Sequence, residues 1–409
     1  MQHNAPYPAI DTLMQQTGCL RWPERWREIY DAAMEDFTKN GCPYTDPGYY
    51  AALASEYGAL SEELETFQQA AVEIGRSEAL SRLLHLLCAA LTQEEFNFSD
   101  TASFRLPFPP ESEPWFGRDM LPGLAFCSQL PRCAAGLRAR KLPEDILHQR
   151  MLVADKIVQD FRKRNNGLPG FDLLDWHQKT IAGTLFRIGR LELDIFQPFL
   201  GDAWVFQNAN GDSVALAYDL SIHRSGMALG ARLFEDPEGS WTADIRETED
   251  AWEGYPFDEL GLVQKQLLRL EKSQWKKVVA KGDPVVQLHI PSGEKLSEEA
   301  VDESLAQMRV FLKTYYPDYQ YTVFACSSWL LDPALETLLG SDSNIVRFSK
   351  RFHPLTRKIH GTSALYFIWG LANADGDLSQ LPANSRLEKA LKQHYLAGKA
   401  VYEVNGYIL

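Results

Sequence analysis

Three side chains that can do acid, base or nucleophilic chemistry lie in or beside apolar segments of this sequence. Glu192 alternates with two leucines, so a strand would place its carboxylate on the face opposite them. His289 and Cys326 stand at or near the ends of two further apolar runs, 285–290 and 321–326. A carboxylate or an imidazole can accept a proton, and a thiol can attack a carbonyl or contact a leaving group. We therefore take these three residues as candidate catalytic groups.

Each candidate also has a purely structural interpretation. If the polar face of its strand meets solvent, Glu192 is a surface residue, whereas burial in a cleft would raise its pKa toward a useful value. His289 could be a histidine held by hydrogen bonds within the fold. Cys326 could be a buried thiol, because no nucleophile-elbow pattern or paired base is visible around it. The sequence leaves both interpretations open for all three residues.

The segment between the two apolar runs predicts how they are placed. Ser297 is a good N-cap, and Glu298 and Glu299 favour the positive end of a helix dipole, so we expect a helix over 297–316. The order is then strand, loop, helix, strand, and such a crossover ordinarily joins parallel neighbours. The carboxyl ends of both strands would meet at one sheet edge, where open α/β sheets bind ligands.

The remaining elements divide the chain into two domains. Apolar positions recur with helical spacing up to about residue 165, and the segment 162–170 then ends a helix with Asn, Gly and Pro. We predict a helical domain over 1–170 and a domain containing a sheet over 171–409. Further strands are expected at 185–196, 213–223, 241–247, 261–270, 345–352, 364–369 and 401–409, and further helices at 271–280, 332–339 and 386–395.

Composition excludes several classes of partner. The formal net charge of -14 opposes binding to a phosphate backbone, so nucleic acid is not an expected partner. No apolar run is long enough to span a bilayer, and the N-terminal residues lack the pattern of a signal peptide. The six cysteines lack paired spacing, which indicates reduced thiols in a cytoplasmic protein. We expect no metal site.

Several segments resemble a known family. They are 186–193 (FRIGRLEL), 282–319, 324–339 (FACSSWLLDPALETLL), 343–352 (SNIVRFSKRF) and 387–409. Together they are similar to bacterial proteins with an acyltransferase N-terminal domain and a GNAT-like C-terminal domain. The resemblance implies an α+β or α/β fold, in which an all-helical N-terminal domain precedes a GNAT-like mixed β-sheet with flanking helices.

The resemblance also implies a site for acyl-CoA. GNAT enzymes bind its pyrophosphate on backbone N–H groups at the start of the helix between two parallel strands, which is a general property of helix N-termini. The matching loop has one glycine, unlike the usual family loop, and Glu294 adds a negative charge, so an ordinary strand-to-helix turn is the alternative. The residues that would bind the cofactor are Pro291, Ser292, Gly293, Lys295, Ser297, Ser327, Ser328, Arg347 and Arg351.

Three functions are compatible with these features. The leading hypothesis is a GNAT-like N-acyltransferase that uses acyl-CoA as a small-molecule donor and an unknown acceptor. The alternative is a non-catalytic, degenerate GNAT fold that binds a small metabolite or a protein partner. A third is a glycan-processing enzyme with paired carboxylates drawn from Glu247, Glu249 and Asp250, which would need a defined distance between them.

Overall fold

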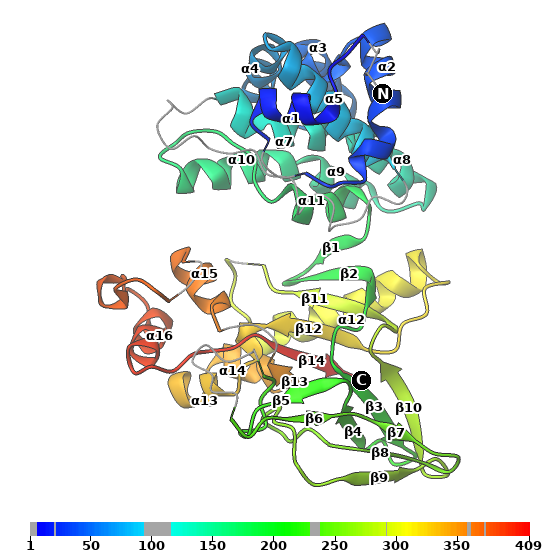
Figure 1. The fold of residues 1–409 in the computed structure, drawn as a ribbon, viewed down its shortest axis with the longest axis vertical. Helices are drawn as coiled ribbons and strands as arrows, with labels where there is room; N and C mark the ends of the chain where they lie inside the picture. The colour runs from blue at the N-terminus through cyan, green and yellow to red at the C-terminus, as the bar shows by residue number, and fades with distance from the viewer. Residues whose placement is uncertain are drawn as a thin grey trace. The chain divides into compact units, whose positions relative to one another are not determined.

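The computed structural model describes residues 6–19, 22–93, 116–229, 238–291, 293–357, 361–371 and 374–409. The chain forms two compact units, Met1–Leu185 and Phe186–Leu409 (Figure 1). The first is built of helices and the second contains the sheets. This confirms the predicted succession of a helical region and a mixed sheet with flanking helices.

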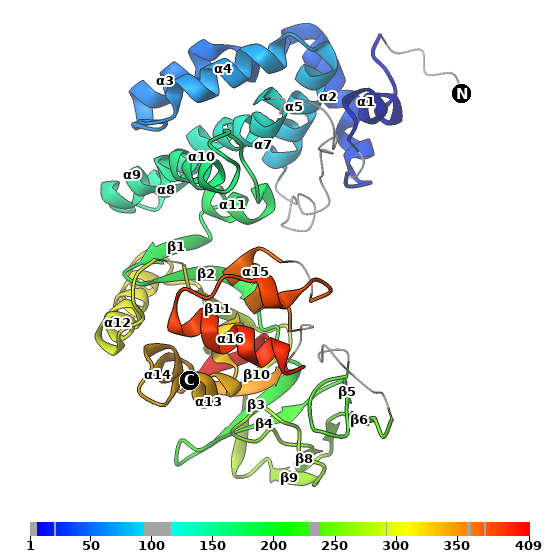
Figure 2. The same cartoon turned by 90° about the vertical axis from the view of Figure 1, so that its left-hand side faces the viewer.

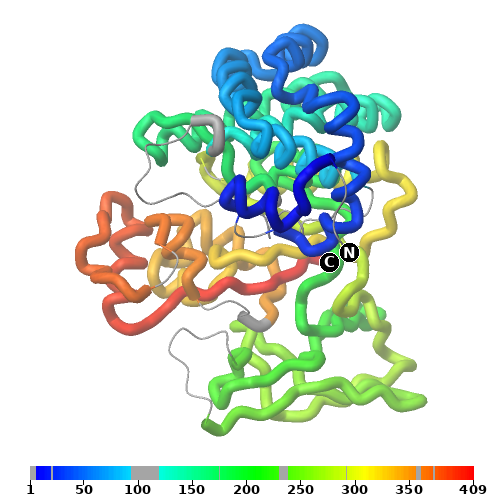
Figure 3. Tube along the Cα trace, turned by 45° about the horizontal axis from the view of Figure 1, so that its top comes forward, coloured from blue at the N-terminus to red at the C-terminus, as the bar shows by residue number. Residues whose placement is uncertain are grey.

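The first unit contains helices coloured blue to green in Figure 3. The helices are α1 (Ile10–Thr17), α2 (Trp26–Asn40), α3 (Pro47–Tyr57), α4 (Leu64–Gly75), α5 (Glu78–Thr92), α7 (Phe116–Ser128), α8 (Leu130–Ala139), α9 (Glu144–Met151), α10 (Val153–Arg164) and α11 (Leu174–Ile181). Their apolar faces form the core. The helix α4, for example, buries Phe67, Ala71 and Ile74 and packs against α3, α5 and α7 (Figure 2).

The second unit is organised around a six-stranded sheet with the order β1-β2-β11-β12-β14-β13. Its strands are β1 (Leu185–Ile188), β2 (Leu191–Pro198), β11 (Pro284–His289), β12 (Phe324–Ser328), β13 (His353–Arg357) and β14 (Val404–Ile408). The strands β11 and β12 are parallel, and β11 pairs with β2 and β12 with β14 in antiparallel fashion. The predicted parallel pair is therefore confirmed.

Smaller sheets lie between β2 and β11 in the sequence. Their strands are β3 (Ala203–Asn208), β4 (Ser213–Ala217), β5 (Leu220–Ile222), β6 (Trp241–Ala243), β7 (Arg246–Glu247), β8 (Ala251–Gly254), β9 (Leu268–Glu271) and β10 (Trp275–Ala280). They pair in the orders β10-β3-β4, β5-β6 and β7-β8-β9. Figure 1 shows β8 and β9 at the end of this unit farthest from β1.

The two faces of the six-stranded sheet have different coverings. On one face, Val285, Ala325 and Tyr407 pack with residues of β3, β4 and β10 in a buried apolar cluster. On the other face lies α12 (Glu298–Tyr315), whose Arg309 stacks on the ring of Phe324 at 4.9 Å. Because side chains alternate along a strand, each residue of β11 and β12 belongs to one of these two environments.

The helix α12 begins where the sequence predicts. The hydroxyl oxygen of Ser297 accepts a hydrogen bond from the backbone N–H of Ala300 at 3.3 Å. The buried Ser304 then ties the helix to the turn between β1 and β2, because its Oγ accepts from the backbone N–H of Arg190 at 2.8 Å and donates to the carbonyl of Ala300 at 2.7 Å. This turn contains Gly189 with φ +61°.

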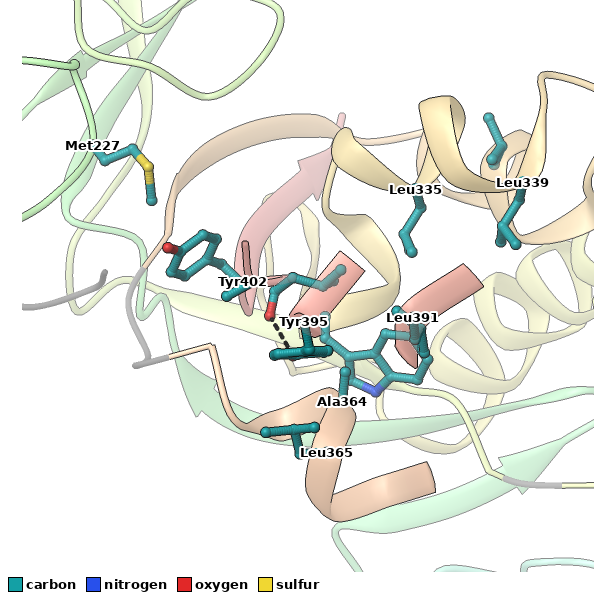
Figure 4. Close-up of a cluster of buried hydrophobic side chains, with 12 residues drawn as sticks. Met227, Leu335, Leu339, Ala364, Leu365, Leu391, Tyr395 and Tyr402 are labelled. Carbon is teal, nitrogen blue, oxygen red and sulfur yellow. Dashed lines mark hydrogen bonds between the residues drawn. The ribbon is translucent and has the colours of Figure 1, made fainter. Parts of the chain in front are cut away.

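A cluster of short helices holds the beginning of β14 (Figure 4). It is formed by α13 (Ala334–Leu339), α14 (Asn344–Ser349), α15 (Ser363–Trp369) and α16 (Arg386–Leu396). The fully buried Asp332 accepts from the backbone N–H of Tyr402 at 2.6 Å, and the hydroxyl of Tyr395 donates to the carbonyl of Gly361 at 2.6 Å. The first bond fixes the chain immediately before β14, and the second joins α16 to the segment before α15.

Three predicted elements are of the wrong type, and the expected strand 261–270 forms only at its end, in β9 (Leu268–Glu271). The expected helix 271–280 is a turn followed by β10, in which the branched and aromatic side chains of the segment WKKVVA favour extended backbone. The expected strands 345–352 and 364–369 are instead largely the helices α14 and α15. Their apolar and aromatic residues suggested strands, but α14 buries Val346 and Phe348, and α15 ends in a left-handed Gly370 that is typical of a helix terminus.

Within the described ranges, none of the helices combines the length and the apolar character that crossing a bilayer requires.

The helical unit should lose stability on mild acidification through His177. Burial lowers the pKa of this histidine from 6.5 to about 4, so the unfolded chain binds more protons between these two values. As the pH falls from 6.5 to 4, the free energy of unfolding should fall by about 1–3 kcal/mol. Urea unfolding of His177→Gln should show a smaller fall, while the exposed His148→Gln serves as the control. An unchanged pH dependence in His177→Gln would contradict the assignment.

Replacing Gly189 should loosen the attachment of α12. A Cβ at this position would lie 2.6 Å from the Ser304 oxygen, and the positive φ adds strain, so Gly189→Ala should lower the free energy of unfolding by roughly 2–4 kcal/mol. Gly282→Ala is the matched control, because Gly282 has φ +93° but no atom near its Cβ position. Equal losses of stability in the two variants would show that the contact with Ser304 contributes nothing.

Candidate active site

The strand register brings polar side chains together in one row on one face of the sheet. Glu192 of β2 lies opposite His289 of β11, and Ser327 of β12 lies opposite Asn405 of β14. The last parallel pair between β11 and β12 immediately precedes His289 and Ser327, so these two residues are the next neighbours. Opposed residues in a sheet share a face, and the row therefore crosses four strands at the carboxyl end of the parallel pair.

A buried carboxylate supports His289. Asp194 has no solvent exposure, and its Oδ2 lies 3.4 Å from Nε2 of His289, whose side chain is 22% exposed. Gln197 donates to the other carboxylate oxygen at 3.2 Å. A carboxylate beside an imidazole holds the ring in one orientation. The arrangement suits a histidine that accepts a proton from a ligand.

Asp194 is a residue that the sequence analysis missed. It lies two positions after Glu192, so the same alternation that turns Glu192 away from the leucines places Asp194 on that face too. Glu192 is partly exposed, whereas Asp194 is fully buried against His289. The spacing of the two acids in the segment LELD was the available signal.

A second carboxylate lies at the other end of the row. Glu403, immediately before β14, accepts hydrogen bonds from the hydroxyls of Ser327 at 2.7 Å and Ser363 at 2.9 Å. The neighbouring Asn405 is 6% exposed, and its Nδ2 has no hydrogen-bond partner among the described residues. Leaving a buried amide donor unpaired costs about 1–3 kcal/mol. Neither Glu403 nor Asn405 was a sequence candidate, because their positions depend on the pairing of β14.

Two of the sequence candidates lie on the opposite face. The side chain of Cys326 points away from His289 and is 2% exposed. Burial, reinforced by the charge of Glu403, raises the pKa of its thiol well above the ordinary value, so the thiol stays protonated at neutral pH. Ser328 accepts the backbone N–H of Leu330 at 3.1 Å and caps the next turn. We leave both out of the proposed site.

The loop before α12 is braced by a buried arginine. The guanidinium of Arg190 donates to the carbonyls of Pro291 and Glu294, both at 2.8 Å, and the residue is only 5% exposed. The carboxylate of Glu294 lies 3.5 Å from Nη2 of Arg187, which offsets its negative charge. Ser292 lies outside the described residues. The shape of the loop therefore depends on Arg190, which sequence reasoning did not single out.

The same loop presents groups that suit an anion. Gly293 has φ +111° and open space around its Cβ position, so a ligand could approach its backbone closely. Lys295 is exposed, and Ser297 caps the helix start. The unpaired N–H groups and the dipole of an α-helix favour negative charge at this end.

The two arginine candidates lie beside the first turns of α12. Arg347 contacts the carboxylate of Glu298 at 3.3 Å, and Arg351 pairs with the carboxylate of Asp302. Both arginines therefore partly neutralise acids near the helix start. Their present partners are protein carboxylates, and a phosphate would have to compete with them.

Solved structures share this fold at low identity. An acyltransferase in complex with decanoyl-CoA and teicoplanin is 19% identical, with a TM-score of 0.61 over 97% of this chain and 98% of that one. A mutant acyltransferase in complex with octanoyl-CoA is 20% identical, with a TM-score of 0.61 and the same coverage. An acyltransferase in complex with CoA and 10C-teicoplanin is 19% identical, with a TM-score of 0.62.

A search of curated protein sequences found no match to this chain. The family model described as the GNAT-like C-terminal domain matches residues 185–408, which is more than half of the chain. The match begins one residue before the second compact unit and includes the whole polar row. The chain belongs to the family of proteins with a GNAT-like C-terminal domain.

Proposed function

We propose that this protein is an N-acyltransferase that transfers an acyl group from acyl-CoA to an amine. The observation that carries the proposal is the pair of His289 and buried Asp194, placed where parallel β11 and β12 end and close to the loop before α12. A proton acceptor and an anion-binding loop at one sheet edge are what the reaction requires. The family membership and the acyl-CoA complexes of structures with this fold support the same reaction.

Each of these residues would have a separate role in acyl transfer. Lys295 and the backbone around Gly293 would bind the pyrophosphate of the donor. His289 would accept the proton of the attacking amine, and Asp194 would stabilise the resulting imidazolium. The new bond joins the amine nitrogen to the acyl carbon, and the bond from that carbon to sulfur breaks. CoA leaves as a thiolate, which takes up the proton that His289 removed from the amine and becomes the thiol.

The cysteines bear on the compartment in which the protein works. No disulfide joins any of the six cysteines within the described residues, and four of them are buried in the helical unit while Cys326 is buried in the sheet unit. Cysteines outside disulfides suit a reducing compartment. We propose a cytoplasmic enzyme whose partners are a small acyl donor and an amine acceptor.

A non-catalytic binding protein is the second candidate function. Glu294, Glu298 and Glu299 place three acids around the start of α12, and the loop has a single glycine. If these acids exclude CoA, the fold would bind another ligand at the polar row. Titration with acyl-CoA separates the two functions.

Lys295 should contribute to binding of the donor. In titration calorimetry of the full chain with octanoyl-CoA, Lys295→Glu should weaken binding about 5- to 30-fold, because a charge-assisted contact of about 1–2 kcal/mol is lost and a repulsive charge is added. Lys313→Glu is the matched control, since it makes the same charge change in the last turn of α12. Octanoyl-pantetheine, which lacks the phosphates, should bind both variants equally.

No binding of octanoyl-CoA, decanoyl-CoA or acetyl-CoA by the unaltered protein would contradict the proposed function. Equal weakening by Lys295→Glu and Lys313→Glu would show that the phosphates lie elsewhere.

His289 should be required for turnover and not for binding. Release of CoA thiol from octanoyl-CoA, measured across a panel of primary amines, should fall about 10²- to 10⁴-fold in His289→Gln, while the Kd for octanoyl-CoA changes little. Asp194→Asn keeps the shape but removes the charge, so its rate should fall as well. His394→Gln, a histidine on α16 outside the polar row, is the control. Full activity of His289→Gln would exclude it as the base.

A further inference from the structure

Asn405 is a buried member of the polar row, and its side-chain amide has a donor that the described residues leave without an acceptor. It is 6% exposed, and its Nδ2 finds no acceptor among the described residues. It lies opposite Ser327, which in turn lies beside His289. A buried donor without a partner is costly, and a bound ligand that supplies an acceptor would remove that cost.

The neighbours of Asn405 have other hydrogen-bond partners. The Ser327 hydroxyl gives its hydrogen to Glu403, and the second carboxylate oxygen of Glu403 receives the hydroxyl of Ser363. Both oxygens of this carboxylate are therefore engaged with hydroxyls. Because α15 supplies Ser363 and the chain before β14 supplies Glu403, the arrangement is fixed by two separate elements.

We propose that the Asn405 amide donates a hydrogen bond to the thioester carbonyl oxygen of the bound acyl donor and stabilises the negative charge that forms there. This role rests on the proposed acyl transfer. His289 and Asn405 lie on either side of Ser327 on one face of the sheet. An amine nitrogen beside His289 and the carbonyl group beside Asn405 would then both lie over Ser327.

His289 and Asn405 would have different roles in the reaction. The amine lone pair forms the bond to the carbonyl carbon, and the carbonyl electron pair moves to oxygen, where the Asn405 N–H meets it. When that pair returns, the bond from carbon to sulfur breaks and the thiolate leaves. Asn405 transfers no proton, whereas His289 removes one from the amine.

An isotope-edited infrared experiment tests this hydrogen bond without an identified acceptor. Octanoyl-CoA labelled with ¹³C at the carbonyl is bound to the full-length protein, and the position of the carbonyl band is compared with that of the free compound. A donated hydrogen bond lowers the stretching frequency. The band should be shifted down in the unaltered protein and should return toward the free value in both Asn405→Leu and Asn405→Asp.

Two further measurements belong to the test: the stability of Asn405→Leu and the carbonyl band of a control variant, Tyr407→Phe. Because Asn405→Leu removes an unpaired buried donor, the variant should unfold at an unchanged or higher urea concentration, unlike the loss of a structural contact. Tyr407→Phe alters the same face of the same strand and should keep the band of the unaltered protein. With an accepting amine, kcat should fall about 10²- to 10³-fold in both Asn405 variants, with little change in KM.

The outcomes separate the two proposals. If the unaltered protein does not bind octanoyl-CoA, the proposed function fails, and the role of Asn405 fails with it. If octanoyl-CoA binds and the carbonyl band is the same in the unaltered protein and in Asn405→Asp, the role of Asn405 is overturned while acyl-CoA binding stands. If Asn405→Leu cannot be obtained folded, Asn405→Asp alone decides.

Discussion

The parallel pairing of β11 with β12 determines which chemistry this unit can perform. Because parallel neighbours have their carboxyl ends at the same edge, the residues that end the two strands must lie side by side. In this register, one face of the sheet presents a row formed by Glu192, His289, Ser327 and Asn405. Cys326 lies on the other face. A shift of one residue in the pairing of β11 with β12 would place Cys326 or Ser328, instead of Ser327, beside His289.

Several buried polar contacts hold that geometry in place. Arg190 fixes the loop before α12 through two backbone carbonyls, and Ser304 fixes the helix to the turn between β1 and β2. At the other side, Asp332 fixes the chain that enters β14. Each contact pairs a side chain with backbone groups at a position where the chain changes direction. These contacts therefore join the ends of the elements that carry the polar row.

The sequence predicted the central part of this fold because its signals are local. Alternation in β2, the apolar runs of β11 and β12, and the N-cap at Ser297 each predict one element, and a short crossover implies parallel pairing. The failures have a physical cause as well. The segments of α14 and α15 are short and rich in aromatic residues, so their patterns fit a strand or a helix, and tertiary packing decides between them.

A site residue could be predicted from the sequence only where the pattern within a single strand reveals its position. Glu192 and His289 could be named from alternation and from their position at a strand end, and Asp194 could have been named in the same way. Glu403 and Asn405 could not, because they reach the row through the antiparallel pairing of β14, far along the chain. Charge compensation of Glu294 by Arg187 likewise depends on a turn that the local sequence of the loop does not reveal.

A crystal structure of the protein with octanoyl-CoA would test the central claim most directly. We predict that the pantetheine arm enters where β11 and β12 end and that the thioester lies over Ser327, between His289 and Asn405. Density for the thioester on the opposite face, beside Cys326 and Ser328, would contradict the account.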